Sequence, residues 1–133
     1  MNSFNAGIVL FKNSEDLIKS TSLFELSEGF VELGAKIVFF DILDEKAAEV
    51  AEKTGAKYIH VNVADEEEVK KGVAEAAEYL GGIDVLVSNA GVSYIAQICD
   101  TANEDLRRVF DTNLTGAFIL AREASKHMVR EHY

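Results

Sequence analysis

Short apolar runs alternate with longer amphipathic segments along the whole chain. The apolar runs cover residues 7–11, 36–41, 57–62 and 84–87. Apart from 57–62, which also has three polar residues, they contain few polar side chains, and none shows a helical period, which is typical of strands buried in a parallel sheet. The pattern therefore predicts four strands.

The segments between these runs carry apolar residues at helical spacing, over residues 22–33, 44–54, 65–80 and 101–132. Ser22 with Glu25, and Thr101 with Glu104, have the spacing of capping boxes. Glycines follow the first three segments and favour helix ends there. In the last helix we expect a buried stripe made of Leu106, Val109, Phe110, Leu114, Phe118 and Ala121. Residues 12–21 are mostly polar and predict a loop.

Strands that alternate with helices across short connections favour right-handed crossovers and a parallel sheet covered by helices. The chain has 133 residues, no proline and no linker-like stretch. We therefore expect one α/β domain over residues 1–133, a Rossmann-like doubly wound parallel sheet that stops after about four strands.

Charge and composition limit the classes of partner that the chain is expected to bind. The chain has 13 basic and 23 acidic residues and a formal net charge of −10, so its surface should repel nucleic acid and anionic membranes. No apolar run approaches the ~18 residues of a membrane span. Cys99 is the only cysteine, which suits a reducing, cytoplasmic setting. The cysteine and the three histidines have no metal-ligand spacing, so no metal site is expected.

Two motifs close together point to a specific chemistry. Ser88-Asn89-Ala90-Gly91 ends the fourth strand with small residues that allow the backbone to lie close to a ligand. Some twenty residues later, the segment 111–118 places Asn113 and a glycine inside a helix, where both residue types are unfavourable and therefore need a reason. With strand, turn and helix in this order, the chain resembles the short-chain dehydrogenase/reductase family from about residue 29 onward.

This resemblance implies an oxidoreductase scaffold that binds NAD, and it assigns the site residue by residue. Asp41, with Ile42 beside it, would bind the adenosine ribose and repel a 2′-phosphate, which favours NAD over NADP. Asn62 and Val63 would contact the adenine. The turn formed by Asn89, Ala90 and Gly91 would lie against the nicotinamide ribose, and Asn113 would belong to the catalytic group.

Each assignment has a plainer structural alternative. Asp41 also fits an acid that only starts the helix after it, and Asn62 fits an ordinary polar loop residue. Asn113 could hold structure without taking part in proton transfer. Tyr94 lies in a loop that lines the substrate pocket in the family, but an aromatic residue there commonly serves packing alone.

Two elements of the family pattern are missing from the 133 residues. There is no glycine between Lys12 and Glu28, so the turn that would hold the pyrophosphate has no counterpart, and Glu15 and Asp16 would repel phosphates there. No tyrosine is followed by a lysine four residues later, which removes the family's proton donor and its ribose anchor. We therefore expect weak NAD binding at best and no activity from the chain alone.

Three hypotheses follow. The chain is an NAD-linked oxidoreductase by descent, acting on alcohols or ketones; or it is a non-catalytic nucleotide-binding or interaction module; or it is a truncated gene product that forms a structural dimer. Because the fourth strand should lie at a sheet edge, we expect a homo-oligomer or a complementing chain.

Overall fold

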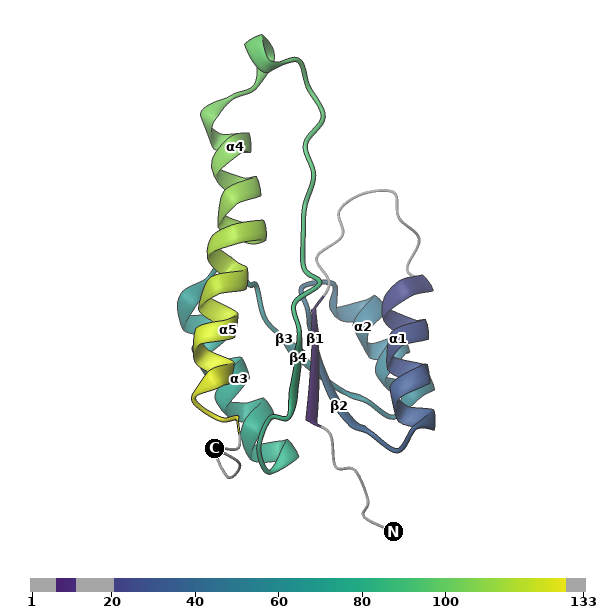
Figure 1. Ribbon diagram of the computed structural model, residues 1–133. Helices are drawn as coiled ribbons and strands as arrows, with labels where there is room; N and C mark the ends of the chain where they lie inside the picture. The colour runs from purple at the N-terminus through teal and green to yellow at the C-terminus, as the bar shows by residue number, and fades with distance from the viewer. Residues whose placement is uncertain (1–6, 12–20, 129–133) are drawn as a thin grey trace.

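The computed structural model describes residues 7–11 and 21–128, and Figure 1 shows how their helices and strands are arranged. The predicted loop at 12–20 and the predicted helix end at 129–133 lie outside these residues. The elements are β1 (Gly7–Phe11), α1 (Thr21–Glu32), β2 (Lys36–Asp41), α2 (Asp44–Thr54), β3 (Lys57–His60), α3 (Glu66–Leu80), β4 (Val85–Val87), a 3₁₀ turn η1 (Ile98–Asp100), α4 (Asn103–Phe110), a π-helical segment η2 (Asp111–Gly116) and α5 (Ala117–Ser125).

The four described strands form one parallel sheet in the order β3-β2-β1-β4. This confirms the predicted Rossmann-like α/β fold. Strand β3 ends at His60, two residues earlier than expected, because Asn62 bonds within the turn that leads to α3. Strand β4 begins at Val85, one residue later than expected.

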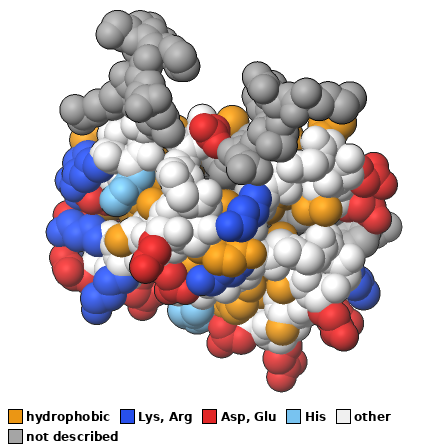
Figure 2. Space-filling view, turned by 90° about the horizontal axis from the view of Figure 1, so that it is seen from below, with side chains coloured by type: hydrophobic (Ala, Val, Ile, Leu, Met, Phe, Trp, Pro, Cys, Tyr) orange, Lys and Arg blue, Asp and Glu red, His pale blue; other side chains and the backbone are white. Residues whose placement is uncertain are grey.

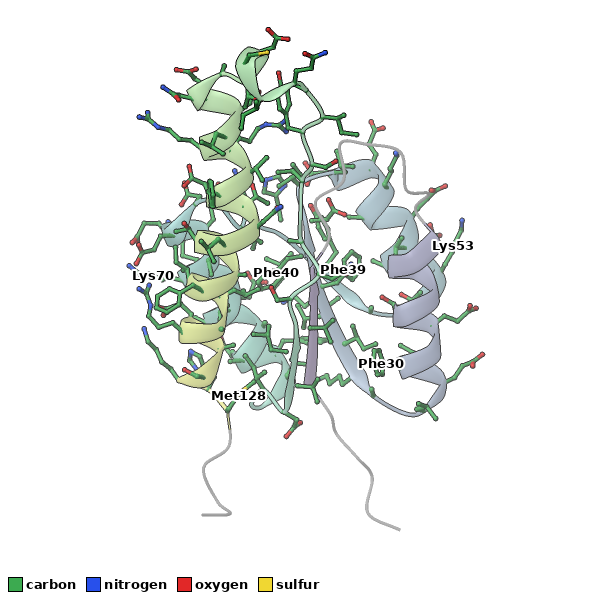
Figure 3. The ribbon with its side chains drawn as sticks, turned by 45° about the horizontal axis from the view of Figure 1, so that its top comes forward. Phe30, Phe39, Phe40, Lys53, Lys70 and Met128 are labelled. Carbon is green, nitrogen blue, oxygen red and sulfur yellow. The ribbon has the colours of Figure 1, made fainter. Side chains whose placement is uncertain are left out.

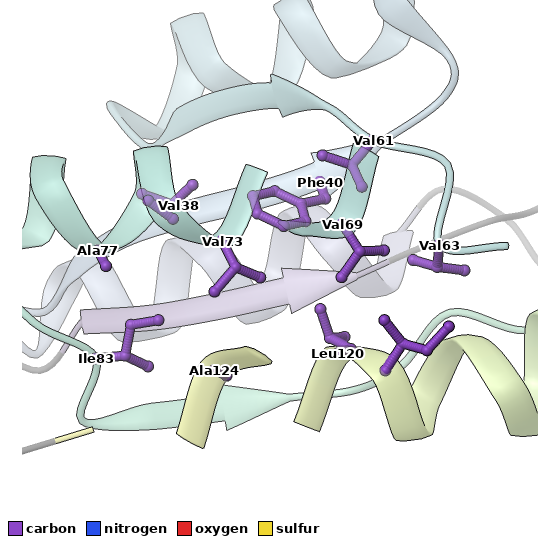
Figure 4. Packing of buried hydrophobic residues seen from close by; sticks show 12 residues of the cluster. Val38, Phe40, Val61, Val63, Val69, Val73, Ala77, Ile83, Leu120 and Ala124 are labelled. Carbon is purple, nitrogen blue, oxygen red and sulfur yellow. The ribbon is translucent and has the colours of Figure 1, made fainter. Parts of the chain in front are cut away.

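Two layers of helices cover the two faces of the sheet, because strands such as β2 have apolar side chains on both faces (Figure 3). The alternate side chains of β2 enter different cores: Ile37 and Phe39 pack toward α1 and α2, whereas Val38 and Phe40 pack toward α3 and α5. All four side chains are at most 2% exposed. Figure 4 shows the second core, where Phe40 lies among valines of β2, of α3 and of the turn between β3 and α3.

The helix starts only partly follow the sequence prediction. Asp65 caps α3, because its carboxylate accepts hydrogen bonds from the backbone N–H groups of Glu67 and Glu68. The capping box predicted at Thr101 does not form, and α1 begins one residue before the cap predicted at Ser22. Helix α1 already begins at Thr21, so Ser22 lies inside it, and the Thr101 hydroxyl donates to the Gln97 carbonyl instead of capping α4.

The last helix differs most from the sequence prediction, in its continuity and in the face that it buries. It is divided into α4, the π-helical segment and α5, and it ends at Ser125. Most of the expected buried stripe is exposed, with Leu106, Phe110, Leu114 and Phe118 between 47% and 64% accessible. A different face packs inward, and its buried members are Thr112, Gly116, Ile119, Leu120, Glu123 and Ala124. The sequence has apolar residues on both faces, and a helical period alone cannot say which face meets the sheet.

Strand β4 lies at the edge of the sheet, and the chain returns to that edge after α5. Ile83 and Met128 form an isolated parallel bridge, in which the Ile83 N–H donates to the His127 carbonyl. Figure 2 shows the molecule from below, at the end where the strands begin, and there acidic and basic side chains are interspersed with apolar ones. No helix within the described residues is both long and apolar enough to cross a membrane.

Candidate functional site

The predicted site residues follow the carboxyl ends of three strands of the sheet, at its upper edge in Figure 1. Asp41 ends β2, Asn62 follows β3, and the turn at Asn89–Gly91 follows β4. Because parallel strands end at the same edge, these residues share one rim. Above it, α4 and the extended segment that follows β4 rise together beyond the sheet.

Asp41 is buried at this rim, with 6% of its surface exposed. One carboxylate oxygen, Oδ1, accepts hydrogen bonds from the backbone N–H groups of Ile42 at 2.7 Å and Leu43 at 3.0 Å. These are the contacts of an acid that starts the next helix. A carboxylate offers about four acceptor positions, so this local role is compatible with ribose binding.

Asn62 also has a clear local role. Its Oδ1 accepts from the Ala64 N–H at 3.0 Å, and its own N–H donates to the Glu68 carboxylate at 2.7 Å. These bonds fix the turn between β3 and α3, with Val63 buried beneath it. The turn therefore holds its shape through its own side chains.

The turn after β4 is held by Asn113. The Asn113 Oδ1 accepts from the Val92 N–H at 2.8 Å, and its Nδ2 donates to the Val92 carbonyl at 2.8 Å. Both backbone groups of one residue are thus paired by one carboxamide, as a neighbouring strand would pair them. Gly91 lies beside this contact, has no positive φ, and a Cβ added there would meet only the Asn113 side chain, at 3.4 Å. Within the described residues, packing therefore does not require glycine at position 91.

The π-helical segment brings Asn113 to this position. Gly116 lies so close to the turn after β3 that a Cβ would be 2.7 Å from the Val63 carbonyl oxygen. This contact joins the turn after β3 to the helical segment whose Asn113 side chain holds the turn after β4. The sequence showed an unexplained Asn and Gly in a helix, and π-turns of this kind are common at functional sites.

A second group of polar side chains, which sequence reasoning missed, adjoins Asp41. The Tyr58 hydroxyl donates to Asp44 Oδ1 at 2.6 Å and lies 3.2 Å from the Asp41 carbonyl, and His60 Nδ1 is 2.8 Å from the same Asp44 oxygen. Hydrogen bonds from Tyr58 and then His60 lower the pKa of Asp44, while burial and Asp44 raise the pKa of Tyr58. The alternation of Tyr58 and His60 along β3 was visible, but their meeting with α2 was not.

A hollow of about 340 Å³ lies next to this group, lined by residues 42–46. Tyr94, by contrast, lies on the extended segment and is 42% exposed; the charge of Asp105 and a hydrogen bond to it raise the pKa of Tyr94. Within the described residues no three His, Cys, Asp or Glu side chains gather as metal ligands would.

Comparison with known proteins gives a consistent result. A family model described as "short chain dehydrogenase" matches residues 24–133. The chain is 41% identical over 97 residues to a 3-alpha-(or 20-beta)-hydroxysteroid dehydrogenase of Mycobacterium tuberculosis, covering 71% of this chain and 37% of that protein. It is 34% identical over 108 residues to "Short chain aldehyde dehydrogenase 1" of Euphorbia lathyris, covering 77% of this chain and 38% of that one. The chain thus spans less than half the length of these relatives.

Solved structures show the same fold. A mutant of a short-chain dehydrogenase/reductase from Serratia marcescens superposes with a TM-score of 0.78 at 23% identity, over 96% of this chain and 53% of that one. A 3-ketoacyl-(acyl-carrier-protein) reductase from Brucella melitensis, complexed with NADH, superposes with a TM-score of 0.77 at 23% identity, over 94% and 51% of the two chains.

Proposed function

Because this chain belongs to the short-chain dehydrogenase/reductase family, we propose that it is the nucleotide-binding half of an NAD-linked oxidoreductase for alcohols or ketones. One observation supports this most: Asp41, Asn62 and the turn held by Asn113 line one rim of a parallel sheet. In open α/β sheets, ligands bind outside the carboxyl ends of the strands.

Each rim residue has a place in this proposal. Asp41 accepts hydrogen bonds from the adenosine ribose, Ile42 and Val63 supply apolar contacts to the adenine, and Asn62 contacts its amino group. Asn89, Ala90 and Gly91 allow the backbone to approach the second ribose. When bound, the nicotinamide supplies or accepts a hydride. Asn113 acts on the turn, which it keeps in one shape by pairing Val92.

The 133 residues contain no tyrosine with a lysine four positions later. The chain alone therefore has no acid to protonate a substrate oxygen, and we propose that it does not turn over alcohols or ketones by itself. We also propose that NAD binds weakly, because no glycine lies between Lys12 and Glu28 to shape a phosphate-binding turn. The acidic charge and single cysteine fit a cytoplasmic protein.

Calorimetric titration with NAD and NADP tests this function. We expect weak binding of NAD, weaker binding of NADP, and no turnover with alcohols. The variant Asp41→Asn keeps the shape of the side chain but removes its charge. It should therefore lower the affinity for NAD and reduce the ratio of the affinities for NAD and NADP. Absence of binding at millimolar NAD would refute nucleotide binding, and a micromolar or tighter complex would refute weak binding.

The exposed face of the last helix favours a second role. Leu106, Phe110, Leu114 and Phe118 recur every four residues and stay half or more exposed, apart from Leu106 at 47%. We name these four residues the apolar ridge. An apolar surface of this kind marks a contact with another chain, and we propose that the ridge mediates self-association or binds a complementing chain.

A further inference from the structure

We propose that Asp44 is a second carboxylate, beside Asp41, that makes the rim select nucleotides with a free ribose 2′-hydroxyl over those with a 2′-phosphate. The inference rests on the proposed nucleotide binding and adds a residue that the sequence pattern did not single out. It is carried by side-chain geometry at the start of α2 and the end of β3.

Asp44 is linked to the backbone carbonyl of Asp41 through the Tyr58 hydroxyl. The Tyr58 hydroxyl lies 2.6 Å from Asp44 Oδ1 and 3.2 Å from the Asp41 carbonyl oxygen, so one hydroxyl bridges the two acidic residues. The same hydroxyl is 3.3 Å from His60 Nδ1. Asp44 therefore has a fixed position relative to the carboxylate proposed to bind the ribose.

The carboxylate of Asp44 is anchored but not covered. Both of its contacts use Oδ1, whereas 70% of the side chain remains exposed. Among the described residues, Oδ2 has no hydrogen-bond partner and is available to the solvent or to a ligand. The hydrogen bonds from Tyr58 and His60 lower the pKa of Asp44, which keeps it ionised at neutral pH.

The hollow beside Asp44 is the space that this charge reaches. Its lining includes two carboxylates, Asp44 and Glu45, and one ammonium group, Lys46. Among the described residues, Asp41, Asp44 and Glu45 give this region more acidic than basic side chains. A ribose with free hydroxyls can donate to carboxylates, whereas a 2′-phosphate brings further negative charge and is repelled.

A purely structural role for Asp44, joining α2 to β3, makes a different prediction. A structural contact affects the binding of every nucleotide alike, because it acts on the shape of the rim. A charge effect changes the ratio between two ligands that differ only in the 2′-phosphate, and it weakens as salt screens it. The ratio and its salt dependence therefore distinguish the two roles.

The test is titration of the intact chain with 5′-AMP and with adenosine 2′,5′-bisphosphate, at about pH 8 and at low ionic strength. Asp44→Asn retains an oxygen for Tyr58 and removes the charge. Glu49→Gln, an exposed acid of the same helix that does not line the hollow, is the matched control. We expect Asp44→Asn to improve binding of the bisphosphate relative to AMP by roughly three- to tenfold, an effect that shrinks at about 0.5 M salt.

An unchanged ratio in Asp44→Asn, or an equal change in Glu49→Gln, would overturn the inference and leave the proposed function standing. A shift in the ratio that persists undiminished at high salt would mean that the charge of Asp44 is not its cause, and it would also overturn the inference. Failure of both nucleotides to bind the unaltered chain would refute the proposed function itself, and the inference with it.

Discussion

The carboxamide of Asn113 pairs with both backbone polar groups of Val92, through two hydrogen bonds of 2.8 Å each. Twenty-one positions separate the two residues in the sequence. The carboxamide makes the two backbone hydrogen bonds that a neighbouring strand would otherwise make with Val92. It also fixes the turn at Asn89–Gly91 relative to the helix. The side chain therefore has a structural task, whether or not it also takes part in proton transfer.

Replacement of Asn113 by alanine should loosen this turn. It leaves the N–H and C=O of Val92 without their partner, and the loss of two hydrogen bonds should lower the free energy of unfolding by about 1–3 kcal/mol. Urea unfolding measures the loss, and amide hydrogen exchange should show faster exchange at Val92. Asn103→Ala, an exposed asparagine at the start of α4, is the control and should change neither. Unaltered exchange at Val92 would contradict the assigned role.

Gly116→Ala should destabilise the protein by about 1–3 kcal/mol, because overpacking moves backbone that has no room. The added Cβ would lie 2.7 Å from the Val63 carbonyl oxygen and 3.1 Å from that of Asp111. Gly29→Ala in α1 meets nothing within 4 Å and should stabilise by up to about 1 kcal/mol through helix propensity. Thermal unfolding of both variants gives the comparison, and equal shifts would show that the contact at Gly116 relaxes freely.

Substitutions that introduce negative charge on the apolar ridge should abolish self-association. Leu114 and Phe118 are 62% and 64% exposed, so replacing both by glutamate should not disturb folding. Sedimentation should show the unaltered chain associating with rising concentration and the double variant remaining monomeric. Leu33→Glu, at a position 80% exposed just after α1, is the control and should associate normally. A monomeric unaltered chain at high concentration would rule out self-association through the ridge.

Glu123 should make stability depend on acid pH. The carboxylate is buried and accepts hydrogen bonds from Lys126 and Arg122, and Arg122 also bonds Glu66 of α3. The hydrogen bond from Lys126 is the main reason why the pKa of Glu123 lies below the ordinary 4.5. A lowered pKa in the folded state stabilises the protein above about 4.5, and this contribution is lost as the pH falls through the folded pKa.

Glu123→Gln should therefore be less stable than the unaltered chain at neutral pH, with the difference closing as the pH falls below the ordinary carboxyl pKa of 4.5. Denaturant unfolding across this range measures the difference. Glu52→Gln, an exposed acid on α2, should show no such convergence. A difference that stays constant with pH would mean that the charge of Glu123 does not contribute.

The sequence predicted the positions of the strands well, but the expected burial on both faces was wrong for β3 and β4, which are only partly buried. It was right for β2, where an apolar run leaves a clear signal. The run at 36–41 is apolar on both faces, and both faces are indeed buried. The glycines at 55 and 81 end α2 and α3 in the left-handed conformation, as their positions indicated. These features depend on local chemistry, so a single sequence contains them.

Features that depend on contacts between distant segments were not predictable in this way. The π-helical turn at 111–116 follows from the close approach of Gly116 to Val63, and the exposure of the apolar ridge follows from which face meets the sheet. Asp44, Tyr58 and His60 meet only when α2 folds against β3. Of the candidate site, the residues that end strands were found and those that meet through packing were missed.

The alternation along β2 has a consequence for how the molecule tolerates change. Phe39 and Phe40 are neighbours in the chain, yet they belong to separate cores on opposite faces of the sheet. Trimming one ring would open a void in one layer and leave the packing of the other intact, since only the backbone connects them. Deleting one residue within the strand would instead exchange the two layers and carry Asp41 away from the rim. Substitutions in β2 should therefore be repairable one layer at a time, whereas insertions and deletions there should not be.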